Sequence, residues 1–284
     1  MAVDPLAQHA GRWFVVKIGG ELAMDRARLA ATVGQAVSTF LKAGIKVAVV
    51  HGGGPQATEL TKKLGLEPKM VGGRRVTDEA TLEVMKMTLA GQVSVDIAAA
   101  FRLAKVPALC TTGVSAGLVV ARKRAPKVIT GAGPAPIDLG LVGDVVSVDV
   151  ALFERLAAAG VVPVLGSLSG DEDGNVFNIN ADTVSTRVAA ALKAAKLLLV
   201  SNVPGVLRDR NDPTTRIPTL TSAEARAQIA NGVIQGGMIP KVEESLAMLD
   251  EGIDAIHIVG LGPPDDAIAG EAKHPGSFGT AFLR

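Results

Sequence analysis

The chain has 284 residues, of which 48% are hydrophobic and 20% charged, and it contains 32 glycines and 15 prolines. This length and composition are typical of a globular α/β protein, and they exclude disordered, collagenous and coiled-coil chains. Its 29 Lys and Arg residues nearly balance its 28 Asp and Glu residues, for a net charge of +1. We therefore expect no nucleic acid partner, because a phosphate backbone is held by a basic surplus.

The chain begins without the basic region and apolar segment of a signal peptide, and its later apolar stretches are interrupted by Lys, Arg, Gly or Pro. We expect a cytoplasmic protein with no membrane partner. The single cysteine, Cys110, excludes an internal disulfide and a zinc cluster of several cysteines. The apolar settings of Cys110 and His257 predict buried structural positions, and the four histidines include no pair with metal-ligand spacing.

Predicted strands and helices alternate along the chain. A β-branched run at 13–18 predicts a strand, and apolar residues at spacings of three and four from 29 to 40 predict an amphipathic helix that Gly44 ends. A buried strand at 47–50 completes a βαβ unit, whose two strands are expected to be parallel. Further strands are predicted near 108–111, 161–165, 197–201 and 255–259, and further helices near 78–89, 150–159 and 183–194.

The segment from 112 to 148 has a different pattern. Short β-branched pieces at 119–121, 128–130 and 145–148 are separated by Gly and Pro, which predicts β-hairpins at one edge of the fold. The rest of the chain favours a mostly parallel central sheet with helices on both faces, the α/β arrangement of an αβα sandwich.

Two glycine-rich loops follow buried strands. Lys17 precedes Gly19 and Gly20 at the end of the first strand, and Gly53 and Gly54 follow the second. At the carboxyl ends of parallel strands such glycines let backbone N–H groups approach an anion, to which the next helix adds partial positive charge. Each loop alone is equally well explained as a tight turn that needs positive φ. Two of them in consecutive βα units favour a phosphate site.

A third glycine pair, Gly236 and Gly237, precedes Pro240 and Lys241. Pro240 at the first position and Gly252 beyond the end predict a helix, in whose first turn Lys241 opposes the helix dipole. With a phosphate bound there, the lysine and the dipole would act together; otherwise Lys241 is a surface charge.

Two polar segments precede predicted helices. Asn180 is the expected N-cap of one helix, with Asp182 as a favourable acid in its first turn. Thr77 is the expected N-cap of the other. Just before it, Arg74 and Arg75 either recognise a carboxylate through bidentate hydrogen bonds or face solvent.

Residues 113–117, Gly-Val-Ser-Ala-Gly, match the GxSxG nucleophile elbow of serine hydrolases. That elbow turns from a strand into a helix, whereas β-branched and Gly/Pro-rich sequence follows here. A hydrolase would also leave Lys17 and Lys241 without a role. A serine hydrolase with Ser115 as its nucleophile is therefore disfavoured.

The motifs run in a fixed order across nearly the whole chain, and together they resemble the amino acid kinase family. The resemblance is closest to the branch that phosphorylates N-acetyl-L-glutamate with ATP in arginine biosynthesis. It implies one continuous sheet in an αβα sandwich, with an N-terminal lobe (1–191) for the amino acid substrate and a C-terminal lobe (192–284) for ATP. The matching segments are 16–20 (VKIGG), 50–55 (VHGGGP), 73–78 (GRRVTD), 178–182 (NINAD), 203–205 (VPG) and 236–241 (GGMIPK).

The resemblance implies roles for individual residues. Lys17 and Lys241 would stabilise the transferring phosphoryl group, and Asp182 would orient these two lysines. Arg75 would bind the α-carboxylate of the substrate and Asn178 its amino acid portion. Mg²⁺ would arrive with ATP, without protein ligands of its own. The implied backbone contacts come from Gly53 and Gly54 for the substrate and from Gly19, Gly20, Gly205 and Gly237 for the phosphates and nucleotide.

The implied reaction suits these residue types. A side-chain carboxylate, with a pKa of about 4.3, is ionised at neutral pH and needs no general base. Positioning and charge neutralisation are then the tasks of the site. The sequence departs from the family pattern at Asn202, where Asp is usual, and at Ser94, where Asn is frequent.

Two other functions share this pattern of residues. One is a kinase for carrier-bound aminoadipate in lysine synthesis, a close relative with most of the same motifs. The other is a nonenzymatic sensor that binds nucleotide or amino acid on the same fold, against which the joint presence of Lys17, Asp182 and Lys241 argues. The resemblance also favours a homodimer, because about twelve residues precede the first strand, fewer than the long N-terminal helix of arginine-inhibited relatives.

Overall fold

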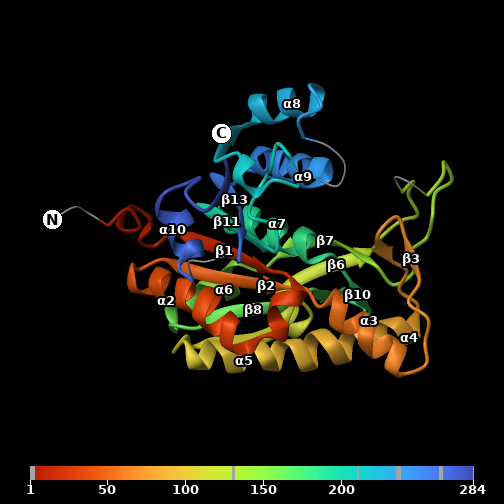
Figure 1. Ribbon diagram of the computed structural model, residues 1–284. Coiled ribbons are helices and arrows are strands. Elements are labelled where there is room, and N and C mark those ends of the chain that lie inside the picture. The colour runs from red at the N-terminus through yellow and green to blue at the C-terminus, as the bar shows by residue number, and fades with distance from the viewer. Residues whose placement is uncertain (1–3, 130–131, 210, 235–237, 262–264, 284) are drawn as a thin grey trace.

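The computed structural model describes residues 4–129, 132–209, 211–234, 238–261 and 265–283. Figure 1 shows a central sheet between two layers of helices, with α2 and α5 on one face and α7 and α9 on the other. The expected αβα sandwich with a mostly parallel sheet is confirmed.

The central sheet has eight strands within the described residues, and six of them are parallel neighbours from β13 to β5. β14 is antiparallel to β13, and β12 pairs with β14 alone. Because β1 pairs with β2 on one side and β11 on the other, the chain changes direction across the sheet at β1, where open α/β sheets bind ligands. The strands, in spatial order, are β12 (Thr219–Thr221), β14 (Gly279–Leu283), β13 (Ala255–Gly260), β11 (Lys196–Ser201), β1 (Trp13–Ile18), β2 (Lys46–His51), β8 (Val162–Gly166) and β5 (Ala108–Thr112).

The two faces of the sheet bury separate apolar cores, because alternate residues of a strand point to opposite faces. Phe14 and Val16 of β1 belong to one core, and Trp13 and Val15 to the other. The first core is covered by α1 (Arg26–Leu29), the π-helical η3 (Ala30–Gly34), α2 (Gln35–Lys42), α5 (Ser94–Leu103) and α10 (Ala267–Lys273). The second is covered by α6 (Val150–Ala158), α7 (Ala181–Ala191) and α9 (Met238–Asp250), with α8 (Ser222–Ala230) beyond α9.

The segment from 112 to 148 forms part of a smaller sheet at one end of the molecule. β6 and β7 form an antiparallel pair, as the predicted hairpins at 119–121 and 145–148 require. Near the third predicted piece, Lys127 bridges to Ile137, and Thr130 lies outside the described residues. The order of this sheet is β10 (Val176–Asn178), β9 (Leu168–Gly170), β6 (Val119–Lys123) and β7 (Gly143–Val148).

The helix predicted at 78–89 is longer than expected. It runs without a break through α4 (Glu79–Lys86), the π-helical η4 (Met87–Val93) and α5. Its N-cap is Asp78, whose side chain accepts a hydrogen bond from the Thr81 N–H at 2.8 Å, and the predicted cap, Thr77, pairs with Gly140 instead. Among the described helices, Glu79–Leu103 alone reaches the length and mean hydropathy of a membrane span, and half of its most apolar window is buried within the fold.

The remaining helical segments are short or border the glycine loops. α3 (Gly54–Lys63) follows β2, and a two-residue hairpin of β3 (Met70–Val71) and β4 (Arg74–Arg75) lies beyond it. Single turns occur at η1 (Ala7–His9), η2 (Gly20–Met24), η5 (Ser115–Gly117) and η6 (Pro213–Thr215).

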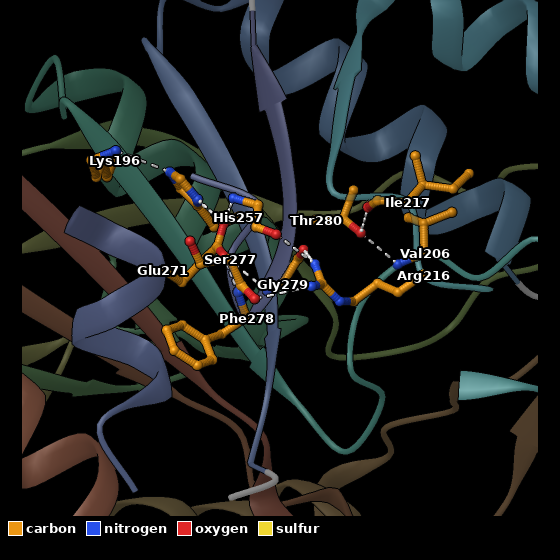
Figure 2. Close-up of polar contacts among 11 residues, drawn as sticks. Lys196, Val206, Arg216, Ile217, His257, Glu271, Ser277, Phe278, Gly279 and Thr280 are labelled. Carbon is orange, nitrogen blue, oxygen red and sulfur yellow. Dashed lines mark hydrogen bonds and ion pairs between the residues drawn. The ribbon is translucent and has the colours of Figure 1, made fainter. Parts of the chain in front are cut away.

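A buried polar cluster holds strand β14 in the sheet (Figure 2). Glu271 of α10 accepts hydrogen bonds from the N–H groups of Gly276, Phe278 and Gly279 at 2.7–2.9 Å and from His257 Nδ1 at 2.9 Å. His257 Nε2 lies 3.2 Å from Lys196 Nζ, so the neutral ring accepts from the lysine and donates to the carboxylate. Burial lowers the pKa of His257, which confirms its prediction as a satisfied core residue. Cys110, predicted on a buried strand, is half-buried in β5.

Candidate active site

The first two glycine loops meet at the carboxyl edge of the sheet. Gly53 is the N-cap of α3 and Pro55 lies in its first turn, while Gly20 begins η2 after β1. A Cβ added to Gly20 would lie 3.0 Å from Gly53 Cα and 3.1 Å from Pro55 Cδ. The two backbones are therefore in contact at a point that admits no side chain on residue 20, which explains the glycine there.

Lys17 projects from the end of β1 on the face covered by α7. Its Nζ lies 2.8 Å from Asp182 Oδ1, and the two side chains are 18% and 33% exposed. Asp182 is in the first turn of α7, and its N–H donates to the side chain of Asn180, the predicted N-cap, at 2.9 Å. The structure thus brings together two residues that the sequence separates by more than half of the chain.

Two cavities open at this edge of the sheet and share Lys17, Gly19 and Gly20 in their walls. The larger has a volume of about 560 Å³ and lies at the ends of β1, β11 and β13. The smaller has a volume of about 350 Å³ and lies over α3 and the β3–β4 hairpin. The two cavities therefore adjoin at Lys17 and the first glycine loop.

Arg75 reaches the smaller cavity from the β3–β4 hairpin. Gly72 and Gly73 have φ of 52° and 74°, the left-handed geometry of a tight two-residue turn. Arg75 Nη2 donates to Thr58 Oγ1 at 2.7 Å and to the Gly54 carbonyl at 3.2 Å, whereas Nη1 is buried without a partner. Burial lowers the pKa of Arg75. An unpaired guanidinium nitrogen beside a cavity is a receptor for an anion.

Other polar groups surround the same cavity. Asn178, on β10, donates from Nδ2 to Thr77 Oγ1 at 3.1 Å, and both Gly53 and Gly54 line the cavity wall. Arg124, which the sequence did not single out, also lines it and pairs with Asp144 at 2.7 Å. No local pattern marks Arg124, because its place beside the site results from pairing within the smaller sheet.

The larger cavity is bounded by the loop after β11. Asn202 lines it together with Pro204 and contacts the carboxylate of Glu21 from the opposite wall. Gly205, predicted at the nucleotide, has a φ of 143° and packs against Thr280 just behind this wall. Glu21 is a second residue that no motif indicated.

The third glycine motif is described in part. Met238–Asp250 forms α9, which confirms the predicted helix, and Lys241 lies in its first turn as expected. Gly236 and Gly237 lie outside the described residues, as does the side chain of Lys241.

The GxSxG segment does not form a nucleophile elbow. Ser115 is exposed in the single turn η5, and strand β6 follows it where the elbow requires a helix. Within the described part of the chain, no three His, Cys, Asp or Glu side chains gather closely enough to hold a metal ion.

Comparison with known proteins gives relatives over nearly the full length. A model of the amino acid kinase family matches residues 12–260. An acetylglutamate kinase of Sorangium cellulosum (strain So ce56) is 50% identical over 269 residues, which cover 95% of this chain and 94% of that protein. An acetylglutamate kinase of Methanocaldococcus jannaschii is 40% identical over 259 residues, covering 91% and 86%.

Solved structures with the same fold include those of two enzymes. N-acetylglutamate synthase from Neisseria gonorrhoeae, complexed with coenzyme A and N-acetyl-glutamate, has a TM-score of 0.81 at 22% identity, covering 99% of this chain and 61% of the synthase. Carbamate kinase from Giardia lamblia bound to AMP-PNP has a TM-score of 0.66 at 17% identity, covering 97% and 99%. By its family match and by its relatives, the chain belongs to the amino acid kinase family.

Proposed function

We propose that the protein transfers the γ-phosphoryl group of ATP to the side-chain carboxylate of N-acetyl-L-glutamate, a step of arginine biosynthesis. The observation that carries the proposal is the position of Lys17 at the junction of the two cavities. The larger cavity accommodates the nucleotide and the smaller the amino acid, so the two substrates would meet at the lysine. Relatives 40–50% identical over nearly the whole chain are acetylglutamate kinases, which supports the same activity.

The transfer forms a bond between a carboxylate oxygen and the γ-phosphorus while the bond from this phosphorus to the β,γ-bridging oxygen breaks. ADP leaves with that electron pair, and the products are an acyl phosphate and ADP. Lys17 would neutralise charge on the phosphoryl oxygens, together with Lys241 from the first turn of α9. Asp182, 2.8 Å from Lys17 Nζ, would hold the ammonium in place.

The smaller cavity has the donors that an acylated amino acid requires. The unpaired Nη1 of Arg75 would bind the α-carboxylate, and Asn178 would contact the neighbouring atoms. The backbone of Gly53 and Gly54 would approach the acceptor carboxylate, and Gly19 and Gly20 the phosphates. We assign Mg²⁺ to the phosphates of ATP, where it would screen their charge.

The test is an assay of purified protein with Mg²⁺-ATP and N-acetyl-L-glutamate, in which hydroxylamine traps the acyl phosphate and ADP is measured in parallel. Glutamate, aspartate and aminoadipate derivatives serve as competing acceptors. We expect product with N-acetyl-L-glutamate at least tenfold above the other acceptors. Preference for a carrier-bound aminoadipate would contradict this assignment in favour of the lysine-synthesis kinase, and binding without ADP formation would favour a sensor.

We also propose two lobes, 1–191 and 192–284, on one continuous sheet. The boundary falls between the end of α7 at Ala191 and the start of β11 at Lys196, and the two lobes join through the β1–β11 pair. The amino acid cavity is lined by the first lobe, whereas the nucleotide cavity lies between the two lobes, with the ends of β11 and β13 on one side and Lys17 and the first glycine loop on the other. Because ATP is the phosphoryl donor, we place the enzyme in the cytoplasm.

We propose further that the enzyme is a homodimer. Strand β5 ends the central sheet, and its Leu109 is 46% exposed. Val95 and Leu103 of the adjoining helix α5 are 65% and 66% exposed. An open sheet edge beside exposed apolar side chains is a surface that a second copy of the chain can cover.

Light scattering after size-exclusion chromatography tests the dimer. We expect twice the mass of the 29.0 kDa chain, and we expect Val95→Asp to shift the mass toward one chain. Val146→Asp, which changes an exposed side chain on β7 of the smaller sheet, is the control. A monomeric wild-type protein would contradict the proposal.

A further inference from the structure

His51 belongs to the glycine-rich loop but is hidden from the cavities. It is the last residue of β2, pairs with Ile18 and Gly166 on the two sides, and is 0% exposed. The described residues that line the two cavities include Gly52, Gly53 and Gly54 but not His51. Its imidazole therefore faces the protein interior directly beneath the loop, and nothing in the proposed reaction so far uses it.

The ring makes one contact through each nitrogen. Nδ1 lies 3.0 Å from the carbonyl oxygen of Gly52, and Nε2 lies 3.2 Å from Ser94 Oγ. Ser94 begins α5 directly after the π-helical segment η4, and its Oγ also lies 2.7 Å from the carbonyl oxygen of Leu89 in that segment.

The contact with Gly52 indicates which nitrogen carries the proton. A carbonyl oxygen only accepts hydrogen bonds, so Nδ1 has to donate to Gly52. Burial lowers the pKa of His51 to about 4, so the ring is neutral at pH 7. Its Nε2 is then unprotonated and accepts the hydroxyl proton of Ser94. The ring therefore presents one N–H, and this N–H is directed at the loop.

The Gly52 carbonyl determines the direction of the next N–H group. In a planar trans peptide the C=O of one residue and the N–H of the following residue point in opposite directions. A Gly52 carbonyl turned inward to His51 thus turns the Gly53 N–H outward, on the side where Gly53 lines the amino acid cavity. Among the described residues no acceptor within the protein pairs with this N–H, which leaves it for a bound group.

Close packing keeps the glycine loop as a whole in place. A Cβ on Gly53 would lie 2.7 Å from Leu89 Cδ2 and 3.2 Å from Val93 Cγ2, and a Cβ on Gly166 would lie 3.3 Å from the His51 ring. The loop backbone and the imidazole are enclosed by the same π-helical segment. The peptide between Gly52 and Gly53 can still rotate, because neither residue has a side chain.

We propose that His51 is a positioning residue for phosphoryl transfer, which holds the Gly52 carbonyl through Nδ1–H and thereby directs the Gly53 N–H at the reacting groups. The inference rests on the proposed function and deepens it. A buried side chain would then orient the backbone N–H donor of the glycine loop, and this requires the Nδ1–H form of the ring.

Two substitutions at position 51 separate the two ring contacts. The amide nitrogen of Asn lies near the position of Nδ1, and that of Gln lies near the position of Nε2. We expect His51→Asn to retain kcat within about threefold and His51→Gln to lower it by about 10–100-fold, as misplacement of a group in a transition-state site does. KM for ATP and for N-acetyl-L-glutamate should change less than about threefold in both, since Gly53 acts on the reacting groups. Ser94→Ala is the matched control, because it removes the contacts of Ser94 with Nε2 and with Leu89 but leaves the Nδ1 contact, and we expect its kcat within about threefold of wild type.

The tautomer is measured on the wild-type protein and so does not depend on the folding of any variant. In ¹⁵N-histidine spectra at pH 7, the resonances lost in His51→Asn should be those of a neutral Nδ1–H ring, and an Nε2–H ring would overturn the proposal. Equal loss of kcat in His51→Asn and His51→Gln, or no loss in either, would overturn it as well. A wild-type protein that makes no acyl phosphate contradicts the proposed function instead, and the spectrum still decides whether the contact exists.

Discussion

Asp182 Oδ1 lies 2.8 Å from Lys17 Nζ, although Lys17 is near the end of strand β1 and Asp182 is in the first turn of helix α7. The pair is one-fifth to one-third exposed, so it contributes little to stability by itself. Its geometry matters for a different reason: a carboxylate at this distance restricts an ammonium that stands between two cavities.

The first prediction concerns this carboxylate. Asp182→Asn should lower kcat by about 10–100-fold, because a lysine without its partner samples positions away from the phosphoryl group. The thermal midpoint should fall by only a few degrees, as expected for a partly exposed ion pair. Steady-state kinetics and thermal unfolding of the same preparation measure both quantities. A variant that is less stable but fully active would show that Asp182 only complements the dipole of α7.

Lys17 itself should have the larger effect. Lys17→Met should lower kcat by about 10²–10³-fold while KM for either substrate changes little, as loss of one preorganised electrostatic donor does. Lys46→Met is the control, because Lys46 lies at the other end of the neighbouring strand and pairs with Glu154. If Lys17→Met kept more than a third of the wild-type kcat, the junction of the cavities would not be the place of transfer.

Arg75 should act on substrate binding. Arg75→Lys should raise KM for N-acetyl-L-glutamate by about 10–100-fold, since a lysine cannot reproduce a planar guanidinium whose hydrogen bonds to charged groups are worth about 1.5–3 kcal/mol. KM for ATP should stay within about threefold. Arg122→Lys, on an exposed position of β6, should change neither constant. Equal effects on the two Michaelis constants would show that Arg75 does not bind the amino acid substrate specifically.

Glu271 should contribute to the stability of the fold and take no part in catalysis. Glu271→Gln replaces one carboxylate oxygen with an N–H donor that faces backbone N–H groups, and we expect a loss of about 3 kcal/mol in the free energy of unfolding. Glu251→Gln, which breaks the exposed ion pair with Arg187, should cost less than about 1 kcal/mol. Urea unfolding at pH 7 compares the two. A loss below about 1 kcal/mol for Glu271→Gln would show that Glu271 does not hold β14 in the sheet.

The buried imidazole of His51 makes stability depend on pH. Its pKa is lowered from 6.5 to about 4 by burial. Between these two values the unfolded chain binds a proton that the folded protein does not, so the free energy of unfolding should fall as pH drops from 6.5 to 4. The contribution of this one group is roughly 3 kcal/mol, from about 1.4 kcal/mol for each pH unit.

Unfolding of wild type and His51→Asn over this pH range isolates that contribution. The lowered pKa of His257 acts in the same direction and is common to both proteins, so it cancels in the difference. The variant should lose less stability on acidification than wild type. Parallel curves would show that His51 takes up no additional proton on unfolding.

Much of the fold was predictable because buried parallel strands leave long apolar runs in the sequence. The strands at β1, β2, β11 and β13 were predicted to within one residue at either end. The length of the helix over 79–103 was underestimated, because its π-helical segment shifts the spacing of apolar residues after Met87. The cap was assigned to Thr77 in place of Asp78, since both residue types favour that position.

The smaller sheet could not be derived in the same way. Strands of three residues, such as β9 and β10, are too short for alternation to appear. Their partners come from far along the chain, so local pattern does not specify register. Arg124 was missed for this reason, and Glu21 because its partner Asn202 is distant in the sequence. Lys17 was found because glycine loops after strands are a local signal. Which nitrogen of His51 faces the loop is likewise a property of packing alone.

The place of β14 in the sheet has a consequence for how the protein is made. Among the described strands β12 pairs only with β14, which follows it by about sixty residues, so the two cannot associate until that stretch has been synthesised. During translation the edge of β13 also stays open until β14 is made, about twenty residues later, and offers its backbone to other chains. We infer that this half of the sheet is the slow-folding and aggregation-prone part of the nascent chain.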